Sequence, residues 1–514
     1  MQGNYLLSID QGTTGTTVLV LDPQKSGKEL VCAQATIDFE QYYPQAGWVE
    51  HNLDEIWASV QKAASRALAI ARQEDENFHP NKIAAIGITN QRETLCFFDR
   101  KSGKALRKAI VWQCKRSTEI CEQIKQSGQE AILREKTGLL ADPYFSGSKL
   151  RWVCENEPTV KNKLASGEGI CGTIDTYLIH RLTQGDSFVT EASNASRTLL
   201  FNIHTGNWDQ DLLELFSVPS PGCLAEIKDS ACLLGKTKGT GFLPDGIPIT
   251  SALGDQQAAL AGQTCFDQGE AKCTYGTGAF LLLQLGKNPI PSQNNLLTTV
   301  SWSLNGSLSY AFEGSAFIAG AAVQYLRDNL SLLEQAADAE YLASDVVGAP
   351  EVYFVPALAG LGAPWWNPNA RGAFFGITRG TNKNQLVRAA LEGMAFQVCD
   401  LLDSMAKDSE HGLKILRVDG GASANNLLMQ VQANLGNIVV ERPRNLETTA
   451  LGAAFFAALG VGIYSSLEEL KKLRTVDSVY NPVINAQEEE IRKEQLAGWK
   501  RAIKAVEVFA DHNP

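Results

Sequence analysis

The sequence predicts an α/β protein with two domains and a cleft between them. The chain has 514 residues. A single hydrophobic core normally supports fewer residues than this. Apolar runs of strand length alternate along it with longer stretches of helical period, which is typical of an α/β fold. A strand, Gly-Thr turn, strand unit opens each half, at 5–21 and at 271–286. We expect domains at 1–251 and 252–514, because the segment 238–255 is rich in Gly and Pro.

The first half is predicted to begin with a hairpin, a helix and a strand. The runs 5–9 and 17–21 are strands joined by the turn DQGTTG. Asn52 is a plausible N-cap for the helix, and 83–88 is a buried strand. One face of that helix carries Ile56, Trp57, Val60, Ala64 and Leu68. Because the hairpin at 271–286 resembles the first one, the chain shows a hint of internal duplication.

Composition excludes several classes of function. The formal net charge is -11 and the pI is near 5.2, which argues against a nucleic acid as the main partner. The start MQGNYLLSIDQGTT lacks the basic and apolar regions of a signal peptide, and no uncharged apolar run reaches the ~18 residues that membrane insertion needs. We therefore expect a soluble, cytoplasmic protein. Its 11 cysteines, without a CxxC pair, are expected to be reduced thiols.

Three turns together predict a nucleotide site. Asp10 ends the first strand and can hold Mg²⁺ through water, while Thr13, Thr14 and the turn glycines offer hydroxyls and backbone N–H groups to a phosphate. The sequence YGTG at 275–278 supplies a second such turn. RVDGGASAN at 417–425 is a strand that runs into paired glycines and then a helix, a platform for adenine or ribose. Alone, the first turn is better explained as an ordinary hairpin turn, and the third is explained equally well as a tight strand-to-helix connection. The three turns together indicate ATP.

Other common sites fail on spacing. The GKT at 235–237 would need a glycine at Ser230 to form a phosphate loop, and no GxGxxG follows a strand. The six histidines have neither metal-ligand spacing nor a GxSxG partner. Hydrolase and metalloenzyme interpretations are therefore weak.

Asp255 is the best candidate for a general base. In LGDQQAALAG it follows a Pro- and Gly-rich approach and precedes a helix of small residues. Phosphoryl transfer depends mainly on positioning and charge stabilisation, and a carboxylate beside the acceptor hydroxyl can take its proton. The local alternative is an ordinary helix N-cap, a position that Asp favours.

With these segments in place, the chain resembles the FGGY family of carbohydrate kinases, and within it the glycerol kinases, nearly from end to end. The specific segments are GITNQRET at 87–94, IVWQCKR at 110–116, DPYFSGSKLRW at 142–152, NASRTLLFNIHT at 194–205 and GLGAPWW at 360–366. The resemblance implies two actin-like (ribonuclease H-like) ATPase domains flanking a catalytic cleft. It also implies ATP-dependent phosphorylation of glycerol to sn-glycerol 3-phosphate, the first step of glycerol catabolism.

The resemblance further implies the site residues, by their match to the family motifs. The substrate-binding residues would be Arg92, Glu93, Trp112, Tyr144, Asp255, Gln256 and Phe280. The ATP-binding residues would be Thr13, Thr14, Gly15, Thr277, Gly320, Gln324, Gly421 and Asn425, with Asp10 serving Mg²⁺. Glycerol has hydroxyls on one side and CH groups on the other, so charged groups opposite aromatic faces suit it. Without the family, the aromatic residues would be core and the Arg-Glu pair a solvated turn.

Two rival functions remain at this stage. Another FGGY kinase, for a different small polyol or ketose, would keep the phosphate turns and Asp255 but change the groups around Arg92, Trp112 and Tyr144. An ATP-driven interaction module of the same superfamily would need a client-binding region, and none is evident. The family also implies a homodimer or homotetramer.

One departure from the family pattern concerns the first phosphate turn. Thr17 stands where many bacterial relatives carry an arginine, so one fixed positive charge near the phosphates is missing. We expect activity to survive with weaker nucleotide binding, because Mg²⁺ and the two N–H-rich turns remain.

A second departure concerns regulation. The loop with which enteric relatives bind fructose 1,6-bisphosphate carries a Gly and an Arg, whereas GTGFLPDG at 239–246 contains neither Arg nor Lys. An inhibitor phosphate would lack its cation there, so we predict little or no inhibition by this metabolite. A steady-state titration that shows strong inhibition would contradict the prediction. The stretch 483–490 likewise lacks a clear match to the docking segment for a phosphotransfer protein.

Overall fold

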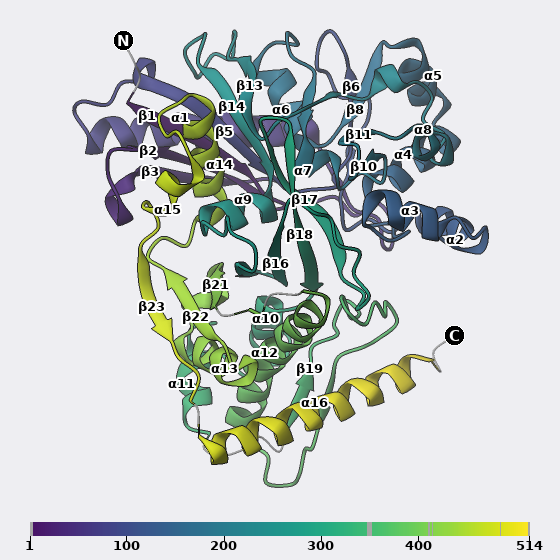
Figure 1. Ribbon diagram of the computed structural model, residues 1–514. Helices are drawn as coiled ribbons and strands as arrows, with labels where there is room; N and C mark the ends of the chain where they lie inside the picture. Colours follow the sequence, from purple (N-terminus) through teal and green to yellow (C-terminus); the bar gives the residue numbers. More distant parts are fainter. Residues whose placement is uncertain (1–3, 347–351, 410–411, 414, 484, 512–514) are drawn as a thin grey trace.

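The computed structural model describes residues 4–346, 352–409, 412–413, 415–483 and 485–511. Two large mixed sheets organise the fold, and Figure 1 shows the first in its upper part and the second running down to its lower part. The strand order is β13-β14-β5-β1-β2-β3 in the first sheet and β17-β18-β16-β15-β21-β22-β23 in the second. The predicted α/β class is confirmed.

The first sheet begins with the predicted hairpin. Its strands are β1 (Tyr5–Gln11), β2 (Gly15–Leu21), β3 (Val31–Asp38), β5 (Ile83–Asn90), β13 (Ala231–Lys236) and β14 (Pro248–Gly254). β1 pairs antiparallel with β2, while β5 lies parallel to both β1 and β14. β1 reads YLLSIDQ and is buried along nearly its whole length, as expected for a strand with covered faces.

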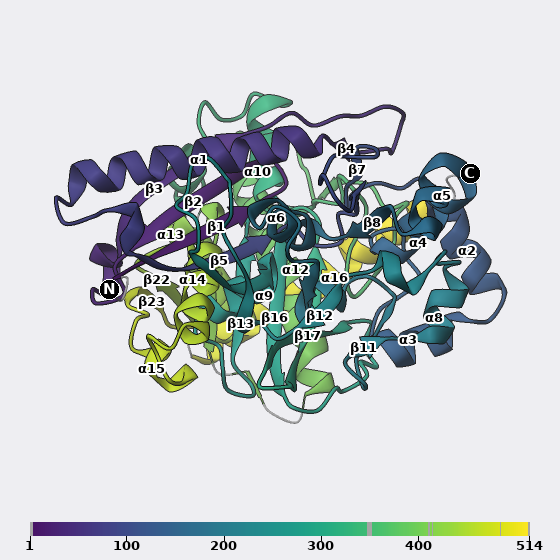
Figure 2. The same cartoon turned by 90° about the horizontal axis from the view of Figure 1, so that it is seen from above.

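Helices cover both faces of the first sheet. On one face lies α1 (Leu53–Glu74), whose N-cap Asn52 accepts a hydrogen bond from the N–H of Asp54; Figure 2 shows this helix from above. The helix α6 (Ile174–Leu182) packs on the same hydrophobic core. On the other face lies α14 (Thr448–Gly460), to which Ser8 Oγ donates a hydrogen bond of 2.6 Å at Ala450 O. Alternate residues of β1 therefore contact different helices.

The second sheet repeats the pattern of the first. Its strands are β15 (Ala271–Tyr275), β16 (Ala279–Gly286), β17 (Leu297–Leu304), β18 (Ser307–Ala316), β21 (Ile415–Asp419), β22 (Val439–Pro443) and β23 (Val476–Tyr480). β15 pairs antiparallel with β16 and parallel with β21, and β21 lies parallel to β22. The central strands of both sheets thus share order and direction, which agrees with the predicted duplication.

The main helices beside the second sheet lie in the lower part of Figure 1. They are α10 (Gly320–Asp328), α12 (Lys383–Asp408), α13 (Asn426–Gly436) and α16 (Ala486–Asp511). The predicted C-terminal helix is α16. It is held by Trp499, whose indole Nε1 donates to Asp400 Oδ2 of α12 at 2.8 Å. Burial raises the pKa of Asp400 to about 6, although two indole donors oppose the shift.

The remaining elements are short. Most of them belong to the segment between β5 and β13, which gathers at the upper right of Figure 1. The helices are α2 (Thr118–Gln126), α3 (Glu130–Thr137), α4 (Ser146–Asn156), α5 (Pro158–Ser166), α7 (Ala192–Ala195), α8 (Gln210–Leu215), α11 (Asp338–Ser344) and α15 (Leu467–Lys471). The paired short strands are β4 (Glu50–His51) with β7 (Ala109–Ile110), β6 (Cys96–Asp99) with β8 (Gly169–Gly172), β9 (Val189–Glu191) with β12 (Glu226–Lys228), β10 (Phe201–Asn202) with β11 (Asn207–Trp208), and β19 (Tyr353–Val355) with β20 (Ala373–Phe375).

All 11 cysteines lie in the described part of the chain and none forms a disulfide there. Among the described residues, no helix has both the length and the apolar character that a membrane crossing requires.

The division into 1–251 and 252–514 stays a prediction. β14 (Pro248–Gly254) runs through that boundary. In addition, α14 comes from the second half of the chain but packs on the first sheet, where Thr250 Oγ1 donates to Ala457 O at 2.9 Å.

A close helix contact joins α14 to α9 (Asp255–Gly262). A Cβ added to Gly452 would lie 1.8 Å from Ala258 O, and one added to Gly262 would lie 1.9 Å from Thr448 O. Both obstructing atoms belong to the backbone, so a side chain at either position forces the helices apart. These glycines set the position of α9, whose first residue is Asp255.

We predict that Gly452→Ala lowers the free energy of unfolding by at least about 2 kcal/mol, because the added methyl overlaps a backbone carbonyl. Urea denaturation followed by circular dichroism measures the change. Gly380→Ala is the matched control, since its Cβ would meet only Thr378 Oγ1 at 3.8 Å. Equal stability of the two variants would contradict the tight contact.

Candidate active site

The carboxyl ends of three parallel strands meet at one edge of the first sheet. Asp10 lies near the end of β1, and Asp255 follows the end of β14. Arg92 and Glu93 follow the end of β5, which lies between those two strands. In open α/β sheets ligands bind at this edge. The fold thus gathers charged residues from distant parts of the sequence.

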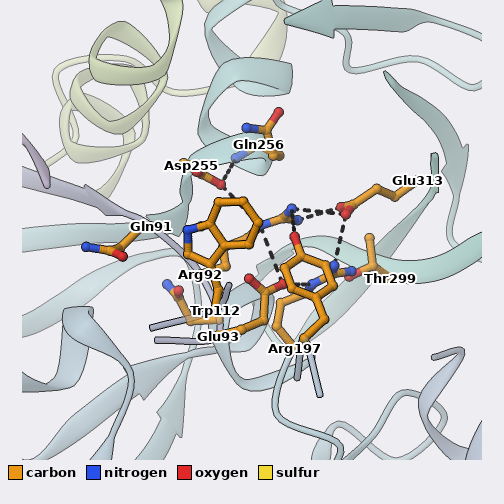
Figure 3. A network of polar contacts seen from close by, with 12 residues as sticks. Gln91, Arg92, Glu93, Trp112, Arg197, Asp255, Gln256, Thr299 and Glu313 are labelled. Carbon is orange, nitrogen blue, oxygen red and sulfur yellow. Dashed lines mark hydrogen bonds and ion pairs between the residues drawn. The ribbon is translucent and has the colours of Figure 1, made fainter. Parts of the chain in front are cut away.

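Arg92 is the centre of a buried ion network (Figure 3). Its side chain is 2% exposed. The guanidinium donates to both carboxylate oxygens of Glu313 on β18, from Nη1 at 2.5 Å and from Nη2 at 3.0 Å. Its Nε lies 3.1 Å from Asp255 Oδ1. Arg92 therefore links the edge of the first sheet to the second sheet.

Arg197 completes the network from a neighbouring loop. Its Nε donates to Glu93 Oε1 at 2.6 Å and its Nη2 to Glu313 Oε1 at 2.9 Å. Burial by itself raises the pKa of Glu313, but Arg197 and Arg92 outweigh it and lower that pKa to about 2. Burial raises the pKa of Glu93, against the effect of the same two arginines. Glu93 also has a left-handed backbone, with φ of 57°, a conformation that costs energy and is frequent at functional sites.

Two of these residues were not singled out from the sequence. Glu313 is a lone acid inside the apolar strand SLSYAFEGSA, and a charge at a buried strand position is the signal that could have found it. Arg197 lies within the motif NASRTLLFNIHT, but its buried position follows only from the tertiary structure.

Aromatic side chains face the charged network. Tyr144 OH accepts a hydrogen bond from Arg92 Nη2 at 3.4 Å. The rings of Tyr144 and Trp112 meet edge to face with centroids 5.6 Å apart. Phe280 pairs with Ser315 on β18, two residues from the pair that holds Glu313, so both lie on one face of that sheet. Of the predicted substrate residues, the structure brings together Arg92, Glu93, Asp255, Tyr144 and Trp112. Their role in substrate binding stays a prediction.

Asp255 is the most accessible carboxylate of the network. Its side chain is 30% exposed, against 0–2% for Glu313 and Glu93. Its Oδ1 accepts the N–H of Gln256 at 2.7 Å. Burial raises the pKa of Asp255, and Arg92 and Lys272 oppose that shift. The N-cap alternative is not what the structure has: Gly254 is the N-cap of α9 and Asp255 is its first residue.

Gln256 faces a buried lysine that the sequence analysis missed. Lys272 Nζ donates to Gln256 Oε1 at 2.5 Å and to Thr274 Oγ1 at 2.9 Å. Burial lowers the pKa of Lys272, although Asp419 and Asp255 oppose the change. The lysine brings a positive charge from β15 toward Asp255.

The acidic edge has the composition of a magnesium site. Burial raises the pKa of Asp10 well above its ordinary value, and Asp255 and Glu447 raise it further. A divalent cation would relieve this repulsion. Within the described residues no group of three or more His, Cys, Asp or Glu side chains could hold a metal by itself. Mg²⁺ keeps several waters and needs one or two carboxylates plus phosphate oxygens, so the residues present fit that ion.

The first predicted phosphate turn joins β1 to β2. Gly12 N donates to Gly15 O at 2.9 Å, which closes the turn around Thr13 and Thr14. The indole Nε1 of Trp112 donates to Thr13 Oγ1 at 3.0 Å. Thr17 pairs across the hairpin with Asp10, and its hydroxyl contacts that of Thr36 at 2.9 Å.

The second and third turns border one pocket of about 400 Å³. Gly320 N donates to Gly276 O at 2.9 Å and Ala319 N to Thr277 O at 2.7 Å, so the second turn is tied to the start of α10. The predicted nucleotide residues in the pocket lining are Thr277, Gly320, Gln324, Gly421 and Asn425. Apolar atoms of Val323, Leu391, Met394 and Leu428 line it too. Asn425 also caps α13, since its side chain accepts the N–H of Leu428 at 2.8 Å.

Comparison with known proteins agrees with this geometry. The model of the FGGY family of carbohydrate kinases, N-terminal domain, matches residues 5–262, and that of the C-terminal domain matches residues 271–461. The chain belongs to the FGGY family of carbohydrate kinases. It is accordingly a phosphotransferase, and its two-domain α/β fold is the ribonuclease H-like ATPase fold.

Relatives match over nearly the whole chain. A glycerol kinase of Bdellovibrio bacteriovorus is 49% identical over 504 residues, 98% of this chain and 99% of the relative. A glycerol kinase of Myxococcus xanthus is 48% identical over 505 residues, again 98% and 99%. The crystal structure of Plasmodium falciparum glycerol kinase with ADP superposes with a TM-score of 0.89 at 36% identity, covering 98% of each chain. A xylulose kinase of Lactobacillus acidophilus, at 22% identity and a TM-score of 0.85, shares the fold.

The loop 239–246 lies against α1. A surface pocket there is lined by Thr240, Gly241 and Phe242 together with Lys62 and Arg66 of α1. The loop itself supplies no cation, but α1 does. Weak inhibition by fructose 1,6-bisphosphate stays a prediction that rests on the loop.

Lys149 holds the loop that carries Tyr144. Its side chain is fully buried, and Nζ donates to the carbonyl oxygens of Pro143 at 2.6 Å, Tyr144 at 2.5 Å and Phe145 at 3.1 Å. An ammonium has three donors, and all three are used here. Burial lowers the pKa of Lys149 to about 8, opposed mainly by Glu93.

We predict that Lys149→Met weakens binding of the polyol substrate about tenfold or more, because three carbonyls lose their donor and Tyr144 loses its fixed position. The KM values for acceptor and for nucleotide separate the effects, and the nucleotide KM should stay within about twofold. Lys161→Met, an exposed lysine of the nearby α5, serves as control. A lower melting temperature with an unchanged acceptor KM would contradict the prediction.

Proposed function

We propose that this chain transfers the γ-phosphoryl group of MgATP to a terminal hydroxyl of glycerol, giving sn-glycerol 3-phosphate and ADP. The observation that carries the proposal is the pairing of Arg92, Glu93 and Asp255 with the rings of Trp112 and Tyr144. Charged groups can bind the hydroxyls while the rings cover the carbon atoms. The 48–49% identity to proteins named glycerol kinase supports the choice of substrate.

Asp255 would act as the general base. It is the accessible carboxylate of the site, and Oδ2 accepts no hydrogen bond from another described residue. Arg92 Nε fixes Oδ1, which would leave Oδ2 directed at the acceptor hydroxyl. Burial raises the pKa of Asp255, so the carboxylate binds a proton more strongly than an exposed one and assists its transfer. Gln256 and Phe280 would complete the substrate site.

The two hairpin turns would bind the phosphates of ATP. Thr13, Thr14 and Gly15 offer N–H and hydroxyl groups on one side, and Thr277 does so on the other. Gly320, Gln324, Gly421 and Asn425 would surround the adenosine in the pocket beside α10 and α13. When bound, Mg²⁺ would neutralise phosphate charge, and Asp10 would hold it through water.

Arg92 and Glu313 would also couple substrate to domain closure. They join the two sheets at the site, and a closed cleft prevents water from acting as acceptor. We expect the enzyme in the cytoplasm, as a homodimer or homotetramer, in the first step of glycerol catabolism.

We predict that Asp255→Asn lowers kcat for glycerol by about 10²–10⁴-fold, the usual contribution of a general base. A coupled assay of ADP release across glycerol, dihydroxyacetone, erythritol and xylulose measures it, and calorimetry checks that MgATP still binds. The control is Asp54→Asn, since Asp54 also lies in the first turn of a helix but is 69% exposed.

Preferred turnover of glycerol that Asp255→Asn abolishes supports the assignment. Preferred turnover of another polyol would support a kinase activity but would show that glycerol is not the preferred substrate. Absence of turnover with any acceptor, while MgATP binds, would favour an ATP-driven interaction module.

A further inference from the structure

We propose that His51, a fully buried histidine behind the first phosphate turn, is a positioning residue that fixes the backbone of residues 12–14 for phosphate binding. The proposal rests on the proposed function, because it assumes that this turn binds ATP. His51 lies on β4 (Glu50–His51), and its ring packs edge to face on Phe39 with centroids 5.0 Å apart.

Each ring nitrogen of His51 holds a glutamine that reaches the turn. Nε2 lies 2.5 Å from Gln41 Oε1, and Gln41 Nε2 donates to Thr13 O at 2.9 Å. Nδ1 lies 3.3 Å from Gln91 Nε2, whose two hydrogens are shared among Nδ1, Gly12 O at 3.1 Å and Gln11 Oε1 at 3.1 Å. Gly12 O also accepts a hydrogen bond from Gln11 Nε2 at 2.8 Å. One imidazole therefore anchors two amide arms on two successive carbonyls of the turn.

The hydrogen bonds define one tautomer of His51. Since Gln41 Oε1 can only accept, Nε2 carries the proton, and Nδ1 is the acceptor for Gln91. Thr94 Oγ1 donates to Gln91 Oε1 at 2.8 Å, which turns the amide nitrogen of Gln91 toward His51 and Gly12. Burial lowers the pKa of His51 to about 4, so the ring is neutral at working pH and this arrangement persists.

Planarity of the peptide bond transmits the effect to the phosphate side. In a trans peptide the N–H of one residue points opposite to the C=O of the residue before it. Holding Gly12 O and Thr13 O toward His51 directs the N–H groups of Thr13 and Thr14 to the other side. Phe39 N adds a third restraint by donating to Thr14 O at 3.2 Å. Among the described residues, neither of those two N–H groups has a hydrogen-bond acceptor, so both are available to an anion.

If His51 had only a structural role, its ring would be buried and both nitrogens hydrogen-bonded, but its partners would not need to contact the turn. Here both partners continue to the turn, and the geometry predicts a specific loss on the nucleotide side. His180 provides the comparison. It is also a buried histidine of the same half of the chain, with its ring 5.1 Å from Phe98, but its Nε2 contacts Arg100 O, far in sequence from the turn.

The test compares His51→Leu, His51→Gln and His180→Leu in the full-length enzyme. His51→Leu removes the imidazole that anchors Gln41 and Gln91, and we expect the KM for MgATP to rise at least about tenfold while the KM for the acceptor stays within about twofold. His51→Gln retains a donor toward Gln41, and we expect it to keep the KM for MgATP within about threefold of the natural enzyme. His180→Leu should lower the melting temperature but leave the KM for MgATP within about twofold.

Calorimetric titration with MgATP alone gives a second readout that needs no acceptor. If the unmutated enzyme binds MgATP but phosphorylates a polyol other than glycerol, the proposed function changes and this inference still stands. If His51→Leu does not fold, the comparison of His51→Gln with His51→Asn decides, because Asn cannot reach Gln41 and should bind MgATP more weakly than Gln. Equal MgATP affinity of these two variants, or an unchanged affinity in folded His51→Leu, would overturn the inference. So would an equal loss in His180→Leu.

Discussion

The structure depends most on the buried contact between Arg92 and Glu313. Arg92 follows the edge of the first sheet and Glu313 lies within the second, so one bidentate pair joins the two halves of the fold at the site. Burying charges is costly, and removal of one partner of such a pair typically costs about 3–5 kcal/mol, a large share of the roughly 5–15 kcal/mol by which a native protein is stable. Arg197 and Glu93 spread the charge further, so that Asp255 can remain partly exposed without leaving the network unpaired.

The fold supplies the frame for that contact twice. In each sheet an antiparallel hairpin lies beside parallel strands. Duplication therefore creates two turns rich in Gly and Thr, which in the proposed function bind the phosphates of ATP. The backbones of α9 and α14 are in such close contact at Gly262 and Gly452 that neither position has room for a side chain. This contact fixes α9, whose first residue is Asp255, against α14.

A second set of buried polar side chains does not face the site but holds the backbone of the loops that form it. Lys149 holds the carbonyls of the Tyr144 loop, and the two glutamines on His51 hold those of the first turn. Buried hydrogen bonds of this kind add modest stability but leave a costly unsatisfied group when broken. They therefore restrict a loop to one conformation, which is what phosphoryl transfer requires.

The sequence alone determined the local elements and the family. The alternation of strands and helices, the Asn52 cap and the amphipathic C-terminal helix are set by interactions within a few residues. The motifs around Arg92, Trp112 and Tyr144 carried the resemblance to the family. The two hairpin turns were predictable because Gly and Thr favour tight turns. Their binding of phosphate stays a prediction. Glu313, Lys272, Lys149 and His51 were not predictable as site residues, since a buried charge or imidazole has meaning only through partners from other strands. Tertiary structure decided which side chains meet, because the energies of buried ion pairs and hydrogen bonds depend on distances between residues far apart in the sequence.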